Sequence, residues 1–159
     1  DRTFVIEVMG RDCGYLALMG GLAAGAEAVL IPEQPFDLDR LATTLQEGRR
    51  RGKQHSIVIV AEGAASAYTI GRRLSRLIGS EVRITVLGHL QRGGTPTAMD
   101  RLISSDMGVA ATEALMDGQR GVMAAHLAGR VVVKSLEEVS QPGCPLDTRL
   151  FQVSDTLAR

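Results

Sequence analysis

Residues 83–101 read RITVLGHLQRGGTPTAMDR, and the rest of the chain is organised around this stretch. The overlapping apolar run at residues 82–87 is rich in β-branched side chains and predicts a buried strand that ends at a glycine. A loop with two adjacent glycines follows, which lets backbone N–H groups approach an anion closely, and a helix is predicted to begin near Ala98. The loop also carries imidazole, amide and guanidinium groups, on His89, Gln91 and Arg92. These residues alone fit an anion site and an ordinary solvated loop equally well.

The composition is typical of a soluble globular protein, with 159 residues of which 45% are apolar and 23% charged. Its 18 basic and 18 acidic residues cancel, which argues against nucleic acid or an anionic membrane as the main partner. No apolar run is long enough to span a membrane and the first residues do not resemble a signal peptide, so we expect a cytoplasmic protein. Cys13 and Cys144 lack the spacing of metal ligands and are predicted to be buried thiols.

Predicted strands alternate with predicted helices through the first half of the chain. The strands are predicted at residues 3–8, 27–31, 56–61 and 82–87, and the helices at 13–24, from 37 to the basic residues near 50, and at 66–79. Strands alternating with helices of this length imply a parallel sheet with right-handed crossovers. The sequence therefore predicts an α/β fold, a three-layer α/β/α sandwich with a mainly parallel, Rossmann-like sheet.

The first predicted helix, residues 13–24, is apolar almost all round, which predicts that other parts of the protein cover it on most sides. Its glycines are predicted to allow close packing, at Gly20, Gly21 and Gly25. No phosphate-binding fingerprint surrounds them.

The next two predicted helices have capping residues and one apolar face each. Asp37 is the predicted N-cap of the first, whose inward face is Leu38, Leu41, Ala42 and Leu45. Ser66 is the predicted N-cap of the second, which ends at Gly79 and whose inward face is Ile70, Leu74, Leu77 and Ile78.

The second half of the chain predicts a long helix and a hairpin. The helix stops near Gly118, and its apolar face is formed by Ile103, Met107, Ala110 and Ala114. Two strands are predicted next, at 122–125 and 130–133, joined by a turn at Ala128-Gly129. A short helix is predicted at 135–139, and a loop and a weak terminal helix are predicted after Pro142.

Polar residues follow three of the predicted strands. They are Met9-Gly10-Arg11 after the first, Glu62 after the third and residues 89–92 after the fourth. Because the carboxyl ends of parallel strands meet at one edge of the sheet, we expect these residues to lie together. A carboxylate at this edge suits sugar hydroxyls, although Glu62 alone fits a solvated loop equally well. We interpret the shared edge as a ligand site.

A cluster of cations, here called the basic turn, follows the second predicted helix. It consists of Arg49, Arg50, Arg51 and Lys53 around Gly52. Cations are favoured at helix C-termini, so on fold physics alone a helix-end role is favoured over an anion site.

Three stretches carry a resemblance to a known family: VIEVMGRDCGYLAL at 5–18, IVAEG at 59–63 and the stretch quoted first. Together they resemble the C-terminal half of 6-phosphofructokinase of the bacterial, allosteric type, from Arg2 to about Val139. The resemblance implies a phosphofructokinase-like fold and implies that residues 1–159 are the C-terminal half of a longer chain. Within it we expect a fructose 6-phosphate-binding lobe at 1–92, a segment at 93–146 that returns to a nucleotide domain outside this sequence, and a tail at 147–159.

The resemblance also implies how the substrate is held. Within one subunit, the residues that hold the sugar and its phosphate would be Met9, Gly10, Glu62, His89 and Arg92. Arg2 and Arg83 would reach the phosphate from the neighbouring subunit, and Arg11, also a substrate-binding residue, would be the catalytic group beside the transferred phosphoryl. Several guanidinium donors suit a dianionic phosphate, since their planar fork matches its oxygen atoms.

An effector site and an oligomer are implied as well. The residues that match the family's site for nucleoside diphosphate or phosphoenolpyruvate are Glu27, Arg51 and Lys53, which moves the interpretation of the basic turn towards an anion site. Gln54 stands where some members carry a further lysine. The expected assembly is a homo-oligomer, a tetramer. ATP and Mg²⁺ are expected to bind mainly outside this chain, because the family's glycine-rich nucleotide loop and its aspartate motif have no match here, and no metal ligand is assigned.

The leading hypothesis is transfer of the ATP γ-phosphoryl group to the C1 hydroxyl of fructose 6-phosphate, giving fructose 1,6-bisphosphate in glycolysis, with the isolated segment inactive. The alternative is the pyrophosphate-dependent relative, which shares the MGR and GHLQRGG stretches but uses another donor. Glu27, Arg51 and Lys53 favour the allosteric, ATP-dependent branch. A third reading, from another class, is a sugar-phosphate-binding module without catalysis.

Overall fold

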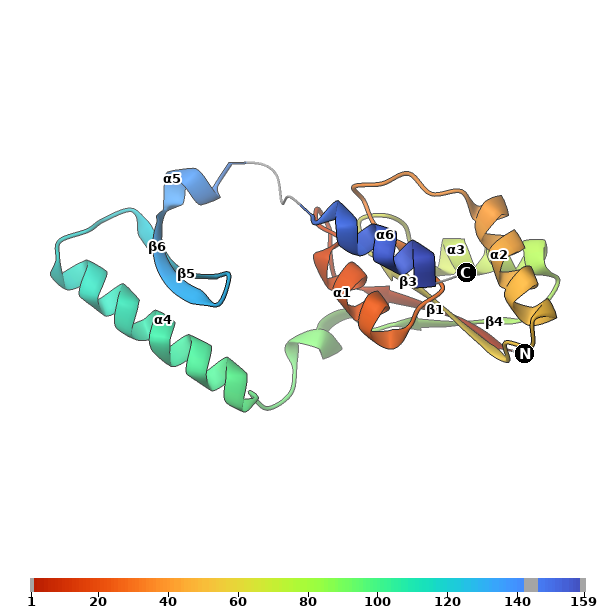
Figure 1. The fold of residues 1–159 in the computed structure, drawn as a ribbon, viewed down its shortest axis with the longest axis horizontal. Helices are drawn as coiled ribbons and strands as arrows, with labels where there is room; N and C mark the ends of the chain where they lie inside the picture. Colours follow the sequence, from red (N-terminus) through yellow and green to blue (C-terminus); the bar gives the residue numbers. More distant parts are fainter. Residues whose placement is uncertain (1, 142–145, 158–159) are drawn as a thin grey trace. The chain divides into compact units, whose positions relative to one another are not determined.

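The computed structural model describes residues 2–141 and 146–157. The chain forms two compact units: unit 1 comprises residues 1–93 and 144–159, and unit 2 comprises residues 94–143. Figure 1 shows a sheet with helices in unit 1, and a long helix with a two-stranded hairpin in unit 2. Every residue proposed from the sequence for the ligand or effector site belongs to unit 1.

Unit 1 is built on a four-stranded parallel sheet. Its strands are β1 Arg2–Val8, β2 Ala28–Leu30, β3 His55–Ala61 and β4 Val82–Val86, in the order β2-β3-β1-β4. β1 pairs with β3 along its whole length and with β4 from Thr3↔Val82 to Glu7↔Val86. All three pairings are parallel, so the carboxyl ends of β1, β3 and β4 lie at one edge. The predicted strands and their parallel arrangement are confirmed.

Helices cover both faces of this sheet (Figure 1). They are α2 Leu38–Arg50 and α3 Ala67–Ile78 on one face, and α1 Tyr15–Ala24 and α6 Thr148–Leu157 on the other. Alternate strand residues point to opposite faces, so Val5 and Val58 belong to the core beside α2 and α3, whereas Val29 and Ile59 belong to the core beside α1. The predicted three-layer α/β/α sandwich is confirmed.

Local sequence signals set the ends of α2 and α3. Asp37 Oδ1 accepts hydrogen bonds from the N–H groups two and three residues later, at 2.9 and 3.3 Å. Ser66 Oγ caps α3 in the same way, and Gly79 ends it in the left-handed conformation. The predicted caps and inward faces are confirmed except at Leu77, which is 38% exposed because it lies at the margin of the buried face. Gly71 lies on that face instead, packed directly against β4.

α1 corrects its prediction, because it starts two residues later than expected and buries only one side. Tyr15 and Leu16 are 51% and 52% exposed, and the buried residues are Ala17, Leu18 and Gly21. A helix that lies on a sheet buries the face that touches it, however apolar its other face is. Gly21 is close-packed as predicted, since a Cβ there would overlap β2, whereas Gly20 faces open space and does not serve packing. Gly25 ends the helix in the left-handed conformation.

The prediction of a buried strand at residues 82–87 was wrong. β4 is an edge strand of the sheet, and Arg83, Thr85 and Val86 are exposed. α3 packs against one face of β4, whereas α1 packs against β2 and β3 on the other face. The apolar pattern indicated burial on both faces, but the described residues cover only one.

Unit 2 confirms the long helix, the hairpin and the short helix. Their bounds are α4 Ala98–Met116, β5 Val122–Leu127, β6 Arg130–Ser135 and α5 Leu136–Val139, with strands longer than predicted. Ala128 and Gly129 form the predicted turn, with φ of 48° and 79°, as two-residue hairpin loops require. Of the predicted apolar face of α4, Ala114 is fully buried and the other three residues are half-buried.

Two remaining expectations concern cysteines and the tail. Cys13 is half-buried rather than buried, because it lies in the connection between β1 and α1. Cys144 and most of the loop predicted after Pro142 lie outside the described residues, and the predicted terminal helix is α6. Within the described part of the chain, no helix has both the length and the apolar character needed to cross a bilayer.

Candidate functional site

The carboxyl edge of the sheet in unit 1 brings together the polar segments expected there. Gly10 N–H donates a hydrogen bond to Glu62 Oε1 at 3.3 Å, and Met9 N–H donates to Gln91 Oε1 at 2.8 Å. The segment after β1 is therefore bonded to the segments after both neighbouring strands. The three segments are residues 9–11, residues 62–63 and the 3₁₀ helix η1 Gly88–Arg92, which replaces the predicted irregular loop.

The backbones of the first two segments approach each other closely. Gly63 N–H donates to the carbonyl oxygen of Gly10 at 3.0 Å, and a Cβ at Gly63 would overlap the carbonyl oxygen of Arg11. Gly10 has a φ of 142°, a conformation that residues with a side chain rarely adopt. These two glycines therefore fix the backbone that carries Arg11.

Glu7 supports the site from within β1. Its Oε2 accepts a hydrogen bond from the N–H of Ala67, the first residue of α3, at 2.7 Å. Its carbonyl oxygen accepts from Leu87 N–H at 3.0 Å, immediately before η1. The carboxylate stabilises the positive end of α3. Neither the bond of Glu7 to α3 nor the bond of Gln91 to Met9 was predicted; for Glu7 the available signal was a charged residue inside an apolar strand.

The side chains of the site are exposed, and among the described residues no carboxylate forms an ion pair with Arg11 or Arg92. Arg11, His89 and Arg92 are exposed, and the ion pairs between described residues are Lys53–Glu27 and Lys134–Glu138. Free guanidinium groups suit an anion with several oxygen atoms, because two parallel N–H groups bind two oxygens at once. Glu62 is exposed as well and offers an acceptor for hydroxyl groups. The arrangement suits a ligand that carries both an anionic group and hydroxyls.

Arg2 and Arg83 lie at the opposite end of the sheet, so the structure does not bring them to the site of their own chain. Arg2 opens β1, which has seven residues. A strand of that length spans roughly 20 Å. Arg83 pairs with Phe4 in the parallel register, which places Arg2, Phe4 and Arg83 on one face of the sheet. Both arginines are exposed.

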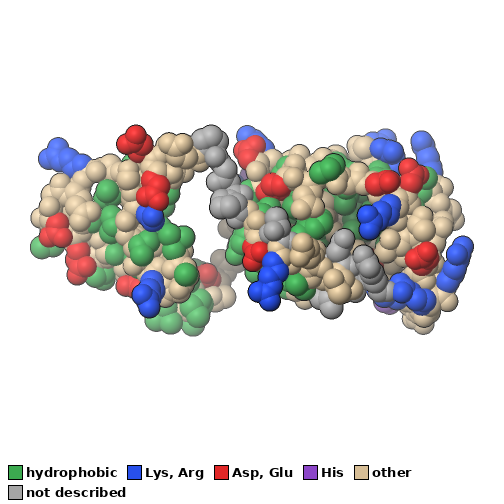
Figure 2. Space-filling view, turned by 45° about the horizontal axis from the view of Figure 1, so that its top comes forward, with side chains coloured by type: hydrophobic (Ala, Val, Ile, Leu, Met, Phe, Trp, Pro, Cys, Tyr) green, Lys and Arg blue, Asp and Glu red, His purple; other side chains and the backbone are tan. Residues whose placement is uncertain are grey.

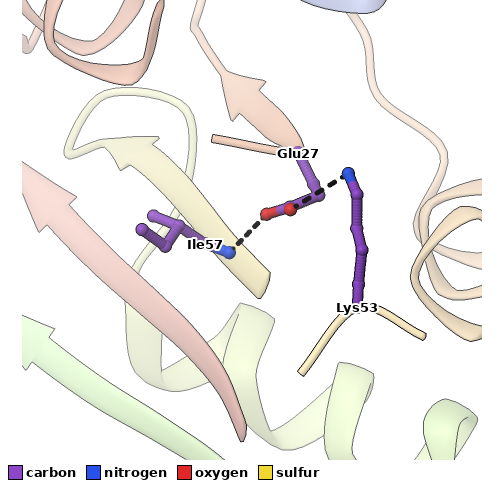
Figure 3. A network of polar contacts seen from close by, with 3 residues as sticks. All are labelled: Glu27, Lys53 and Ile57. Carbon is purple, nitrogen blue, oxygen red and sulfur yellow. Dashed lines mark hydrogen bonds and ion pairs between the residues drawn. The ribbon is translucent and has the colours of Figure 1, made fainter. Parts of the chain in front are cut away.

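Two of the three candidate effector residues are in contact (Figure 3). Glu27, whose side chain is 10% exposed, accepts a hydrogen bond from Ile57 N–H at 2.6 Å and pairs with Lys53 Nζ at 3.4 Å. Arg51 is exposed. Figure 2 shows several Lys and Arg side chains gathered at the end of unit 1 that carries the N-terminus. This end of the sheet therefore offers a second group of cations, separate from the carboxyl edge.

Clusters of metal ligands are absent from the described residues, and the common nucleotide-binding motifs are absent from the sequence. The described residues contain no group of three or more His, Cys, Asp or Glu side chains placed to hold a metal ion. The sequence contains neither a Walker-type phosphate loop nor a dinucleotide fingerprint.

Comparisons with known proteins identify relatives of the whole chain. Residues 1–115 match the phosphofructokinase family. The chain is 50% identical over 158 residues to the ATP-dependent 6-phosphofructokinase of Thermotoga neapolitana, and 46% identical over 158 residues to that of Halalkalibacterium halodurans. Each comparison covers 99% of this chain and 50% of the relative, so the chain spans about half the length of the curated relatives it matches.

Solved structures agree with these relatives. Pichia pastoris phosphofructokinase in the T-state superposes with a TM-score of 0.80 at 34% identity, covering 98% of this chain and 18% of that one. The pyrophosphate-dependent phosphofructokinase of Marinobacter aquaeolei gives a TM-score of 0.75 at 25% identity, covering 87% and 40%. Since the family match extends over most of the sequence, the chain belongs to the phosphofructokinase family.

Proposed function

We propose that the complete gene product, meaning this chain with any further sequence its gene encodes, phosphorylates fructose 6-phosphate at its C1 hydroxyl with ATP, in the cytoplasm. The observation that supports this most strongly is that residues 9–11, 62–63 and 88–92 lie together at one sheet edge, where Arg11 and Arg92 form no ion pair with any described residue. The relatives at 50% and 46% identity are named ATP-dependent, whereas the pyrophosphate-dependent structure matches at 25%. ATP is therefore the proposed donor.

In this proposal, Arg92 and His89 bind the 6-phosphate, and Glu62 accepts a hydrogen bond from a sugar hydroxyl. Glu62 bonds to Gly10 N–H through Oε1, which leaves Oε2 for the ligand. Met9 and Gly10 supply the backbone against which the sugar lies, and Gln91 holds that backbone to η1. In this proposal the ligand binds to segments that hydrogen bonds already hold together at the ends of three strands.

Arg11 is proposed to act on the phosphoryl group during transfer. Negative charge develops on the equatorial oxygens, and a fixed guanidinium stabilises it most when no reorganisation is needed. The close approach of Gly63 to the Arg11 backbone fixes the point from which that side chain extends. We assign the proton acceptor for the C1 hydroxyl and the groups that bind ATP and Mg²⁺ to sequence beyond this chain, in a nucleotide domain to which residues 93–146 return.

The proposed assembly is a homotetramer in which each subunit lends Arg2 and Arg83 to its neighbour's substrate phosphate. Their position about one strand length from the site of their own chain supports this sharing. Nucleoside diphosphate or phosphoenolpyruvate is proposed to bind beside Glu27, Arg51 and Lys53. The pairing of Lys53 with Glu27 supports a site whose cation changes partner when an anion arrives.

The test assays the complete gene product with fructose 6-phosphate and either ATP with Mg²⁺ or pyrophosphate with Mg²⁺, and identifies the product by ³¹P NMR. We expect fructose 1,6-bisphosphate with ATP and none with pyrophosphate. Turnover with pyrophosphate alone would assign the alternative donor. Binding of the sugar phosphate without turnover would leave a non-catalytic binding module, and absence of binding would overturn the proposal for the site.

A further inference from the structure

Arg49 differs in its surroundings from the other cations of the basic turn. It lies in the last turn of α2 and is half-buried, whereas Arg50 and Arg51 are exposed. Its Nη2 donates hydrogen bonds to Ser80 Oγ at 2.7 Å and to Thr3 Oγ1 at 3.2 Å. Thr3 is 0% exposed, so Arg49 is a donor to a hydroxyl that water does not reach. The proposed catalytic and effector sites do not involve Arg49.

The two partners of Arg49 lie close to Arg2 and Arg83, the arginines proposed to bind the phosphate: Thr3 is the second residue of β1, and Ser80 lies two residues before β4. Thr3 follows Arg2 directly, and Ser80 lies three residues before Arg83. Thr3 also forms the first pair of the β1–β4 ladder. One guanidinium group on α2 therefore joins the start of β1 to the segment that leads into β4.

Other hydrogen bonds hold the same corner of unit 1. Arg2 N–H donates to the carbonyl oxygen of Gln54, which follows the basic turn, at 3.0 Å. Ser75 Oγ donates to the carbonyl oxygen of Ser80 at 2.8 Å, which ties Ser80 to α3. Together with these bonds, the hydrogen bonds of Arg49 hold in place the backbone segments that carry Arg2 and Arg83.

Arg49 lies on the opposite face of the sheet from Arg2 and Arg83. Successive strand side chains point to opposite faces, and Thr3 points towards α2, as its bond to Arg49 shows. Arg2 and Arg83 share the other face. Arg49 can therefore influence a phosphate held by these two arginines only through the backbone of β1 and β4.

We propose that Arg49 is a positioning residue that fixes the first residues of β1 and β4, and through them the guanidinium groups of Arg2 and Arg83, for binding of the substrate phosphate. This inference rests on the proposed function, in which those two arginines reach a neighbouring subunit's substrate. A guanidinium suits the task because it stays charged and donates in fixed directions to both hydroxyl oxygens. A displacement of about 1 Å at a binding group can cost on the order of 10²-fold in rate, so a small shift of the strand ends has a measurable effect.

The first test is steady-state kinetics of Arg49→Met in the complete gene product, since methionine keeps an apolar stem and removes both hydrogen bonds. We expect the KM for fructose 6-phosphate to rise by about tenfold, with the KM for ATP and kcat changed much less. Arg49→Lys should restore part of the affinity. The matched control is Arg40→Met, which removes an exposed charge from the same helix and should leave all three constants unchanged. Equal effects of the two Met substitutions would overturn the inference.

A second measurement separates the positioning role from a general loss of stability. In the Arg2→Ala/Arg83→Ala background, adding Arg49→Met should raise the KM no further, because the residues through which it acts are gone. Additive effects would contradict the inference. If the Arg2→Ala/Arg83→Ala variant itself leaves the KM for fructose 6-phosphate unchanged, the proposed function of those arginines fails. If that variant raises the KM while Arg49→Met does not, only the positioning role fails.

Two further variants serve if circular dichroism shows that Arg49→Met does not fold. Thr3→Val and Ser80→Ala each remove one acceptor and keep the Arg49 side chain in place. Each should raise the KM for fructose 6-phosphate partway towards the value for the Arg2→Ala/Arg83→Ala variant. An unchanged KM in both would overturn the inference.

Discussion

Among single residues, two glycines are expected to respond differently to substitution, because Gly63 lies against the backbone of the site and Gly20 has open space around it. A side chain at Gly63 would overlap the Arg11 carbonyl oxygen, so we expect Gly63→Ala to displace residues 9–11 and to cost about 1–3 kcal/mol of unfolding free energy. Gly20 has open space inside α1, so Gly20→Ala should add up to about 1 kcal/mol. Denaturant titration of both variants measures the difference in unfolding free energy. The KM for fructose 6-phosphate of each variant shows whether the site is displaced. Equal changes in stability would show that the close approach at Gly63 is not limiting.

A second prediction for a single residue concerns the role of Arg11 in phosphoryl transfer. If its guanidinium stabilises the transition state more than the bound substrate, Arg11→Ala should lower kcat by a larger factor than it raises the KM for fructose 6-phosphate. Steady-state kinetics of the complete gene product measure both constants. A change confined to the KM would make Arg11 an ordinary substrate-binding residue.

At the scale of elements, the N-terminus of α4 depends on a reciprocal cap. Thr97 Oγ1 accepts from Asp100 N–H at 3.2 Å, and Asp100 Oδ2 accepts from Thr97 N–H at 2.7 Å. The Thr97 backbone N–H, followed by its hydroxyl, lowers the pKa of the Asp100 carboxyl. A lowered pKa means that the carboxylate stabilises the cap fully above the ordinary aspartate pKa of about 3.9, and that this contribution is lost as the pH falls below that value.

The corresponding experiment compares amide hydrogen exchange in the first turn of α4 for the parent and Asp100→Asn. We expect faster exchange in the variant at neutral pH, because the charged acceptor is gone. The difference between the two proteins should shrink as the pH falls below about 3.9, where the parent carboxyl becomes protonated. A difference that stays constant across this range would exclude a role for the carboxylate charge.

The elements also show which features a sequence can specify. Asp37 and Ser66 were predictable as caps because the groups that they bond to lie within three residues. Met9 and Gln91 are 82 residues apart, and Glu7 and Ala67 are 60 apart, so no local pattern reports their contacts. The common edge was predictable because parallel topology alone places the strand ends together.

The exposure of side chains was the least predictable property, because it also depends on residues that are distant in the sequence. Val86 and Leu16 are as apolar as core residues but remain 45% and 52% exposed, because burial depends on which element covers a face. Periodicity specifies which side of an element is apolar. It does not specify what packs against that side.

For the assembly as a whole, we propose that subunits share their sites, because Arg2 and Arg83 lie about one strand length from the carboxyl edge of their own chain. We expect that Arg83→Ala and His89→Ala, each inactive alone in the complete gene product, regain activity when mixed under conditions of subunit exchange. Some mixed interfaces then combine an intact His89 from one subunit with an intact Arg83 from its neighbour. Mixtures that stay inactive despite verified exchange would confine the site to one subunit.

We propose that this chain holds the phosphate of the sugar substrate at the carboxyl edge of its sheet. The most direct test is the KM for fructose 6-phosphate of Arg92→Ala in the complete gene product, with Arg73→Ala, an exposed cation of α3, as the matched control. Loss of a desolvated charge partner costs about 2–5 kcal/mol, so the KM should rise by at least about tenfold, while the KM for ATP and both constants of the control stay unchanged. An unchanged KM for fructose 6-phosphate in Arg92→Ala would contradict the account.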